Sequence, residues 1–422
     1  MFGAKIRIFL RPGLGLKRWL VMLAVGLVLF SIGVGFLMES PVSPKILPIL
    51  RYITLENFSP VTRGLVFIAV GVIINAYPAF KSIQWLIAAA RQEDRSLDIL
   101  TAMDRKRRLG QGLNIVAIGG GTGLSTVLRG LKHATSNITA IVTIADDGGS
   151  SGRLGSDLQM PPPGDARNCL VALSESEPLL EELFNYRFDE RSSLHGHSLG
   201  NLLLAALYDM RGGFQESLED AGSLLALQGR VIPVSEEEKM VLKGETIDGT
   251  LLQGESEVGH APAPIKKVWI EPITSQASET AISAIDKADL IVIGPGSLYT
   301  SIIPNFLVGG IKEALSKSKV AKVFICNVST QVHETDGYGV KEHLQAFSEH
   351  SGVSPSHILV NNNVHDSPID SRQTVIAPVS QISNFNGTII DADLLDLNLP
   401  NRHDPEKLAA ALLTIRAHAR IG

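Results

Sequence analysis

Residues 114–124 read NIVAIGGGTGL, a short apolar run that passes directly into a glycine-rich turn. The apolar run predicts a buried strand over 114–118, and the apolar spacing after the turn predicts a helix near 124–132. A second apolar run, ITAIVTIA, predicts a strand over 138–145. Strand, helix and strand in this order are typical of a parallel-sheet α/β fold.

The same alternation extends to the C-terminal end of the chain. Further strands are predicted at 289–293, 322–326 and 357–360, and helices near 166–173, 178–186, 199–210, 307–315, 341–350 and 405–419. Residues 230–272 differ, because they combine β-rich pieces with an Asp248-Gly249 hairpin signal and few helical patterns. We therefore predict a parallel-sheet α/β domain over 114–422 with a β-rich insertion at about 230–272.

The first 90 residues have a different character. Residues 19–38 are an uncharged run of 20, and residues 64–80 are a second uncharged run of 17. As a helix the first run would span ~30 Å, about one bilayer core. We interpret residues 1–90 as a hairpin of two transmembrane helices, about 19–38 and 64–80, with two buried core helices as the alternative. A cleaved signal peptide is disfavoured, because the run is long and no small-residue cleavage site follows it.

Positive charge predicts how this hairpin is oriented. Five Lys and Arg precede the first run, seven follow the second and three lie between the runs. By the positive-inside rule both termini and the main domain face the cytoplasm, with residues 91–113 as a juxtamembrane linker. The expected location is therefore the cytoplasmic membrane.

Composition excludes several classes of function. The net charge of −5 argues against a nucleic-acid binder that works through bulk charge. Two cysteines in 422 residues, Cys169 and Cys326, exclude a disulfide framework and a cysteine-rich zinc site. Cys326 lies within an apolar strand and is predicted to be a core residue.

Two glycine-rich loops follow predicted strands and are candidates for phosphate binding. Gly119–Gly123 would bring backbone N–H groups and a helix N-terminus to an anion. The spacing of its glycines matches neither a dinucleotide fingerprint nor a P-loop. The alternative is that this segment is only a tight turn. Gly294–Ser301 (GPGSLYTS) adds hydroxyl groups and Tyr299, whose ring could stack on a base. Two such loops at strand ends of one sheet would form a crevice suited to a nucleotide diphosphate.

Polar residues after the second strand suggest further contacts. Asp146 and Asp147 could hold Mg²⁺ or accept ligand hydroxyls, although neighbouring side chains diverge in a strand, and a locally capped turn is the alternative. The Gly148–Gly152 segment (GGSSG) suits a mobile phosphate-contacting lid or a plain loop.

Two further motifs contain polar side chains near predicted helix starts. Asp165 is expected to cap a helix that places Arg167 and Asn168 in its first turn, where the arginine could clamp a phosphate or pair with an aspartate. In the motif HGHSLGN (195–201), His197 and Asn201 could bind a ligand or serve capping and packing, and zinc is disfavoured.

Taken together, these motifs closely resemble the gluconeogenesis factor (YvcK) family, which is related to 2-phospho-L-lactate transferase (CofD). The matching stretches, within 114–352, are GGGTGL (119–124), ADDGGSSGR (145–153), PPPGDARNCLVAL (161–173), HGHSLGNLLL (195–204), GES (254–256) and GPGSLYTSI (294–302). The chain departs from the family's usual Thr-Gln-Pro-Gly-Glu-Thr at Thr330–Thr335, where Val332 and His333 replace the Pro-Gly turn.

The resemblance implies binding of UDP-N-acetylglucosamine and a role in cell shape and envelope synthesis during gluconeogenic growth. It also implies a Rossmann-like domain, with Asp146 and Asp147 at an acceptor or Mg²⁺ position. The transferase relatives move a phospholactyl group from a guanosine-linked donor to a deazaflavin with Mg²⁺. The predicted nucleotide- and phosphate-binding residues are Gly119, Gly120, Gly121, Thr122, Gly123, Gly148, Gly149, Ser150, Ser151, Arg167, Asn168, His197, Asn201, Gly294, Pro295, Gly296, Ser297, Tyr299, Thr300 and Ser301.

Three functions follow as hypotheses. The first is a membrane-tethered nucleotide-sugar sensor that regulates envelope synthesis through protein partners, favoured because no nucleophile–base pair is evident. The second is a CofD-like transferase that uses a nucleotide-linked donor and Mg²⁺. The third is a membrane scaffold with a vestigial pocket. We also expect a homo-oligomer that does not bind nucleic acid.

Overall fold

The computed structural model describes residues 22, 25–32, 59, 61–62, 64–72 and 99–419, except 176, 190, 191, 193, 238, 365–375, 377, 378, 380, 381 and 384. The chain divides into two compact units, Met1–Arg108 and Leu109–Gly422. Each unit is described by itself.

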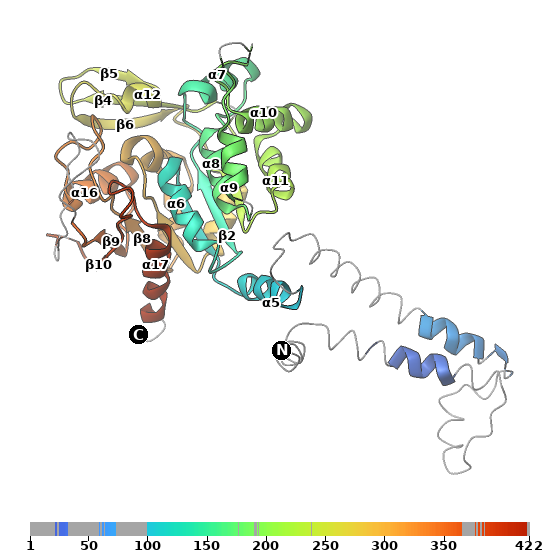
Figure 1. The fold of residues 1–422 in the computed structure, drawn as a ribbon. Coiled ribbons are helices and arrows are strands. Elements are labelled where there is room, and N and C mark those ends of the chain that lie inside the picture. The colour runs from blue at the N-terminus through green and yellow to red at the C-terminus, as the bar shows by residue number, and fades with distance from the viewer. Residues whose placement is uncertain are drawn as a thin grey trace. The chain divides into compact units, whose positions relative to one another are not determined.

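The second unit is built on a parallel sheet of seven strands in the order β10-β9-β8-β7-β1-β2-β3 (Figure 1). This sheet confirms the predicted α/β fold. The strands are β1 (Ile115–Gly119), β2 (Ile138–Val142), β3 (Arg230–Pro233), β7 (Leu290–Ile293), β8 (Lys322–Ile325), β9 (His357–Asn361) and β10 (Thr388–Ala392).

The strand order reverses between β1 and β7. From β1 the chain proceeds outward to β2 and β3, then returns to the other side of β1 and proceeds outward again from β7 to β10. Ile115 of β1 pairs with Ile138 of β2 on one side and with Leu290 of β7 on the other. At such a point the loops after the two central strands leave a crevice between them.

Two groups of helices flank the main sheet of the second unit. In one group, α6 contacts α8 and α17. In the other group, α14 contacts α15 and α16, and α15 also contacts α13. Right-handed crossovers that run in opposite directions from β1 place one group on each face of the sheet. The helices are α5 (Ile99–Gly110), α6 (Gly121–Leu131), α7 (Gly149–Leu158), α8 (Gly164–Leu173), α9 (Glu177–Asn185), α10 (Leu199–Arg211), α11 (Phe214–Leu224), α12 (Glu255–Val258), α13 (Glu279–Asp286), the π-helix η1 (Leu298–Ile302), α14 (Ile303–Leu307), α15 (Ile311–Lys317), α16 (Val340–Ser351) and α17 (Pro405–Ala419).

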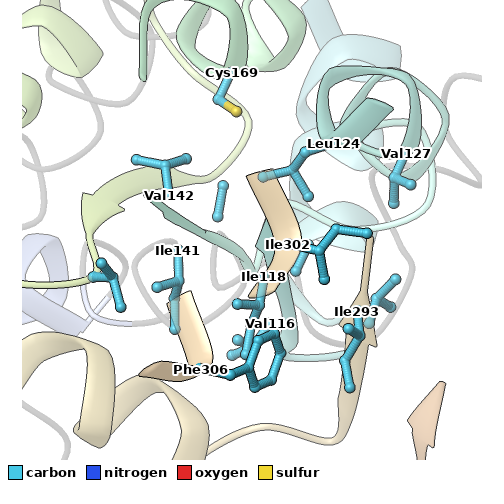
Figure 2. Close-up of a cluster of buried hydrophobic side chains, with 14 of the residues drawn as sticks. Val116, Ile118, Leu124, Val127, Ile141, Val142, Cys169, Ile293, Ile302 and Phe306 are labelled. Carbon is cyan, nitrogen blue, oxygen red and sulfur yellow. The ribbon is translucent and has the colours of Figure 1, made fainter. Parts of the chain in front are cut away.

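The hydrophobic core lies directly beneath the two glycine-rich loops. Ile118 of β1 and Ile293 of β7 are fully buried, and Leu124 of α6 and Phe306 of α14 belong to the same cluster (Figure 2). Burial of each such side chain contributes about 1.5–3 kcal/mol. The loops therefore stand on buried core residues of the domain.

Both cysteines are core residues. Cys169 of α8 points into the cluster shown in Figure 2, and Cys326, just after β8, is also fully buried. Burial raises the pKa of the Cys326 thiol to about 12. Neither thiol is therefore placed to act as a nucleophile.

The β-rich insertion is smaller than the interval predicted for it. Its strands, β4 (Val241–Thr246), β5 (Leu251–Gln253) and β6 (Ile265–Glu271), form a separate antiparallel sheet in the order β5-β4-β6. The predicted turn joins β4 to β5 with Gly249 at a φ of +88°. Residues 230–233 instead form β3 at the edge of the main sheet, because Val231 and Ile232 are buried beside β2.

Two local predictions are wrong. The helix predicted near 307–315 is two helices, α14 and α15, separated by a break at Gly310 with a φ of +93°. The segment predicted as a lid or loop at 148–152 instead begins α7, with Ser150 and Ser151 buried. Helix formation there follows from packing, since α7 contacts α10.

In the first unit, residues 25–32 and 64–72 are helical and lie side by side (Figure 1). A β-carbon built on Gly71 would lie 3.1 Å from the carbonyl oxygen of Gly26 and 3.3 Å from Phe30. The predicted runs 19–38 and 64–80 fall partly outside the described residues. Within the described part of the chain, no helix combines the length and apolar character needed to cross a membrane.

Candidate functional site

The two glycine-rich loops meet in one cavity at the point where the strand order reverses. This cavity, called here the switch-point cavity, measures about 290 Å³. It is lined by Gly120, Gly121, Thr122, Gly123, Thr126, Pro295, Gly296, Ser297, Ser301, Asn327, Val328, Ser329, Thr330, Gln331, Asn401, Arg402 and His403. Eight predicted residues are therefore brought together, from loops about 175 residues apart in the sequence.

The first loop presents the N-terminus of α6 to this cavity. The helix begins at Gly121, whose φ is +65°, and Gly120 occupies its N-cap position without a side-chain cap. The N–H groups of a first helical turn have no partner within the helix and carry partial positive charge. A glycine-lined helix start of this kind is suited to binding an anion.

The second loop is held against the first by buried hydrogen bonds. Asn305 Nδ2 donates to the carbonyl oxygen of Gly119 at 3.1 Å and to that of Ser301 at 2.9 Å. A carboxylate oxygen of Glu334 accepts from the backbone N–H groups of Tyr299, at 2.6 Å, and Thr300, at 3.1 Å. Burial raises the pKa of Glu334 to about 7. The loop is thus fixed before any ligand binds.

Tyr299 itself does not enter the cavity. Its side chain is 2% exposed, and its hydroxyl lies 2.9 Å from that of Tyr338. The ring makes an edge contact with His350. Tyr299 is therefore part of the packing beneath the loop and is not available to stack on a base.

Two segments of the cavity wall were not expected from the sequence. One is Asn327–Gln331, which follows β8: Ser297 Oγ donates to Gln331 Oε1 at 2.6 Å, and Asn327 Nδ2 donates to the carbonyl oxygen of Gly296 at 2.9 Å. A polar run after an apolar strand at the same edge of the sheet was the signal that could have found it.

The other segment is Asn401–His403, just before α17. Arg402 is exposed and is the only charged side chain among the described residues that line the switch-point cavity. His403 is buried, and its Nε2 donates to the carbonyl oxygen of Cys326 at 3.2 Å. Burial lowers the pKa of His403 to about 4, so the ring is neutral at pH 7. Arg402 therefore supplies the positive charge of this wall.

A cluster of carboxylates lies beside the first loop. Burial, and then the charge of Asp146, raise the pKa of Asp165 to about 7. Burial and the Asp146 and Asp165 carboxylates raise the pKa of Glu255 to about 10. Among the described residues, nothing forms a hydrogen bond with Oδ2 of buried Asp165. Asp165 lies within the first turn of α8 and does not cap it.

The adjacent aspartates after β2 have different partners. Asp146 Oδ1 accepts from the N–H of Gly148 at 2.8 Å, whereas Asp147 Oδ1 accepts from the N–H of Ser256 in the insertion at 2.9 Å. Within the residues that the structure covers, no three His, Cys, Asp or Glu side chains are grouped so as to hold a metal ion. A cation bound here would therefore need further oxygen atoms from a bound molecule, such as those of a phosphate group.

A second cavity, of about 530 Å³, lies between this rim and the insertion. It is called here the insertion cavity and is lined by Asp146, Gly148, Glu255, Ser256, Gly259, His260, Ser297, Thr300, Gln331, Val332 and His333. Ser297 and Gln331 line both cavities. The hydrogen bond between these two residues therefore marks the boundary between the cavities.

Several of the other predicted residues form a largely buried network instead of lining a cavity. Arg167 donates to Ser198 Oγ at 2.7 Å and to Asn201 Oδ1 at 3.0 Å. Asn201 Nδ2 in turn donates to Ser150 Oγ at 3.1 Å. This network joins α7, α8 and α10. It also includes Asn168, Ser151 and His197.

Comparison with known proteins identifies the family. The family model of 2-phospho-L-lactate transferase CofD matches residues 115–395. The gluconeogenesis factor of Halalkalibacterium halodurans is 47% identical over 311 residues, which are 71% of this chain and 95% of that protein. The chain belongs to the gluconeogenesis factor family of CofD-like proteins.

Other members show how much of the chain the family accounts for. The gluconeogenesis factor of Bacillus subtilis is 43% identical over 73% of this chain and 99% of its own length. A relative from Nostoc sp. is 39% identical over 96% of this chain and 91% of its own. A crystal structure of a Bacillus halodurans protein, 46% identical, superimposes with a TM-score of 0.66 over 72% of this chain and 99% of that one. The gluconeogenesis factor family therefore includes members that match nearly the whole of this chain and members that match about three quarters of it.

Proposed function

We propose that this gluconeogenesis factor is a regulatory protein that binds a nucleotide sugar, UDP-N-acetylglucosamine, in the switch-point cavity. The observation that carries the proposal is that Gly120–Gly123, Pro295–Ser297 and Ser301 line one cavity together with Arg402. Backbone N–H groups, hydroxyls and a guanidinium are the groups that bind a diphosphate. The proposed role of the protein is the regulation of envelope synthesis and cell shape through protein partners, and the described residues that line the cavity include no nucleophile–base pair.

Calorimetry on the purified full-length chain tests this proposal. We expect UDP-N-acetylglucosamine and UDP to bind at one site per chain, and we expect adenosine to bind far more weakly, because it lacks the diphosphate. Failure of both uridine nucleotides to bind at millimolar concentration would refute the proposal.

The second candidate function is a CofD-like transferase that uses a nucleotide-linked donor. The specific observation in its favour is that Asp146 lies near enough to Asp165 for its charge to raise the pKa of Asp165, and carboxylate oxygens are ligands that Mg²⁺ prefers. Asp146 and Asp165 would hold the ion together with donor phosphates. Bound Mg²⁺ would neutralise charge on the donor phosphates.

Mass spectrometry of a reaction mixture separates the two candidates. The full-length chain would be incubated with Mg²⁺, a guanosine-linked phospholactate donor and a deazaflavin acceptor. Product formation that is lost in Asp146→Asn supports the transferase. Nucleotide binding without any product supports the regulatory protein.

We further propose that the N-terminal hairpin tethers the protein to the cytoplasmic membrane, with the main domain in the cytoplasm. The uncharged runs and their flanking Lys and Arg residues support this proposal, as does the close packing of Gly71 against Gly26 and Phe30. Sedimentation of the full-length chain with membranes, resistant to high salt and alkaline carbonate but released by detergent, is the expected result. Release by carbonate alone would contradict it.

A further inference from the structure

His333 has an unusual backbone conformation at the mouth of the insertion cavity. Its φ is +71°, in the left-handed region that favours glycine, and it is one of three non-glycine residues with positive φ in the described part of the chain. Its side chain is exposed and lines the cavity. A strained non-glycine residue in a cavity wall calls for a functional explanation.

The loop that carries His333 is fixed on both sides. The N–H of His333 donates to Asp336 Oδ2 at 2.8 Å, and the N–H of Gln331 donates to Thr335 Oγ1 at 2.8 Å. Glu334, the next residue, bonds to the backbone of Tyr299 and Thr300. The imidazole of His333 is therefore presented to the cavity from a rigid loop, whereas no described residue forms a hydrogen bond with that ring.

A second imidazole faces the same cavity from the insertion. The rings of His260 and His333 have centroids 6.3 Å apart at an angle of 33°. Nδ1 of His260 lies 2.8 Å from the carbonyl oxygen of Ser256, which can only accept, so Nδ1 donates and Nε2 is the acceptor of the neutral ring. The pair thus bridges the mouth between the insertion and the main domain.

The rest of the cavity wall is strongly polar. Asp146 and Glu255 provide carboxyl groups, and Ser256 and Thr300 provide hydroxyl groups. Hydroxyl groups of a ligand can donate to the carboxyl oxygens and can both donate to and accept from imidazole nitrogens. A compact group with many hydroxyls is the chemistry that this wall matches best.

We propose that His333, with His260, binds the hydroxylated group attached to the distal phosphate of a nucleoside diphosphate, and that His333 makes the protein discriminate between the sugar nucleotide and the free nucleotide. The inference rests on the proposed binding of the diphosphate in the switch-point cavity. The two cavities share Ser297 and Gln331, so a ligand that extends past this pair enters the insertion cavity.

Replacement of His333 by glycine removes the imidazole and keeps a residue that accepts the backbone conformation. In calorimetry on the full-length chain, His333→Gly should bind UDP as the wild type does. We expect its affinity for UDP-N-acetylglucosamine to fall about five- to tenfold, the effect of one lost hydrogen bond. His333→Asn, which tolerates positive φ and keeps a polar group, should recover part of the difference.

The matched control is Ala226→Gly, which relieves positive φ at an exposed residue outside both cavities, where φ is +49°. It should leave the ratio of the two affinities unchanged. Thermal unfolding would verify that all variants fold, and His333→Gly should be at least as stable as the wild type.

The outcomes separate this inference from the proposed function. If the wild type binds neither nucleotide, the proposed function fails. If the wild type binds both but His333→Gly keeps the same affinity ratio, or if the sugar adds nothing to the affinity of the wild type, the role of His333 is overturned.

Discussion

Gly123 and Pro295, which lie on different loops, are in direct backbone contact. A β-carbon built on Gly123 would overlap the carbonyl oxygen of Pro295 and would lie 2.7 Å from the Cα of Gly296. Both neighbours are backbone, so neither can rotate away. The loops after β1 and β7 are therefore interlocked, and the shape of the switch-point cavity depends on glycine at position 123.

Gly123→Ala should separate the two loops. We expect a loss of about 1–3 kcal/mol in unfolding free energy, typical of overpacking, and a loss of nucleotide affinity of at least tenfold. Urea unfolding and calorimetry with UDP measure the two effects. The control is Gly110→Ala, because a β-carbon there has Ser136 Oγ at 3.9 Å as its nearest neighbour. Unchanged affinity in Gly123→Ala would show that the cavity is not the binding site.

Arg402→Gln removes the positive charge of the switch-point cavity. Hydrogen bonds to charged groups contribute about 1.5–3 kcal/mol, so we expect UDP affinity to fall by about one to two orders of magnitude with little change in stability. The affinity of the wild type should also decrease with added salt more steeply than that of the variant. Lys317→Gln, which removes a positive charge from the exposed end of α15, should have neither effect. Equal UDP affinity in Arg402→Gln and the wild type would remove Arg402 from the site.

Glu334→Ala should destabilise the domain, because the N–H groups of Tyr299 and Thr300 would lose their buried acceptor. Unsatisfied buried donors cost about 1–3 kcal/mol each, so a loss of a few kcal/mol is expected. Glu334→Gln keeps one oxygen acceptor, so its unfolding free energy should fall clearly less than that of Glu334→Ala. Urea unfolding of the two variants is the measurement. An alanine variant as stable as the glutamine variant would mean that this carboxyl group does not hold the loop.

Asp165 should make stability depend on pH. Its pKa of about 7 in the folded state lies above its ordinary value of 3.8, so the folded chain binds more protons between these pH values. The stability that the folded chain gains from this extra bound proton is fully present below pH ~4. It is lost as the pH rises through 7. Asp165→Asn should therefore stabilise the protein at pH 8, by on the order of 1–3 kcal/mol, and less at pH 5.

Chemical unfolding at pH 5, 6.5 and 8 in the presence of EDTA measures the effect of Asp165. The matched control is Asp209→Asn on the exposed surface of α10, where a substitution changes stability by at most about 0.5 kcal/mol. A stability difference between Asp165→Asn and the wild type that is the same at all three pH values would contradict the expectation.

Much of the fold could be predicted because its signals are local. Buried parallel strands appear as short apolar runs such as 114–118 and 289–293, and both are strands in the structure. The limits of the insertion could not be read in this way. Val231 and Ile232 show the same β pattern whether they pair in the main sheet or in the insertion, so pairing alone decides which.

The site was predictable only where backbone geometry determines it. A glycine-rich loop after an apolar strand indicates a turn at the edge of the sheet that can bind a phosphate, and the two loops of this kind line the switch-point cavity. Arg167 and Asn201 have side chains that bind phosphate and pack a core equally well, and only tertiary contacts show that they bond to each other. Arg402 lies in a segment with no pattern of its own, brought to the rim by the docking of α17 against α6.

The pairing of β1 with β7 has a consequence for assembly of the chain. Ile115 and Leu290 are register partners across a stretch of about 175 residues, so this pairing carries a large loop-closure cost and depends on most of the polypeptide having been synthesised. A ligand held between the loops that follow these strands would bind only after the strands have paired, and it would stabilise the paired state. The concentration of that ligand would then influence how long newly made chains remain open to proteolysis, as well as what the mature protein does.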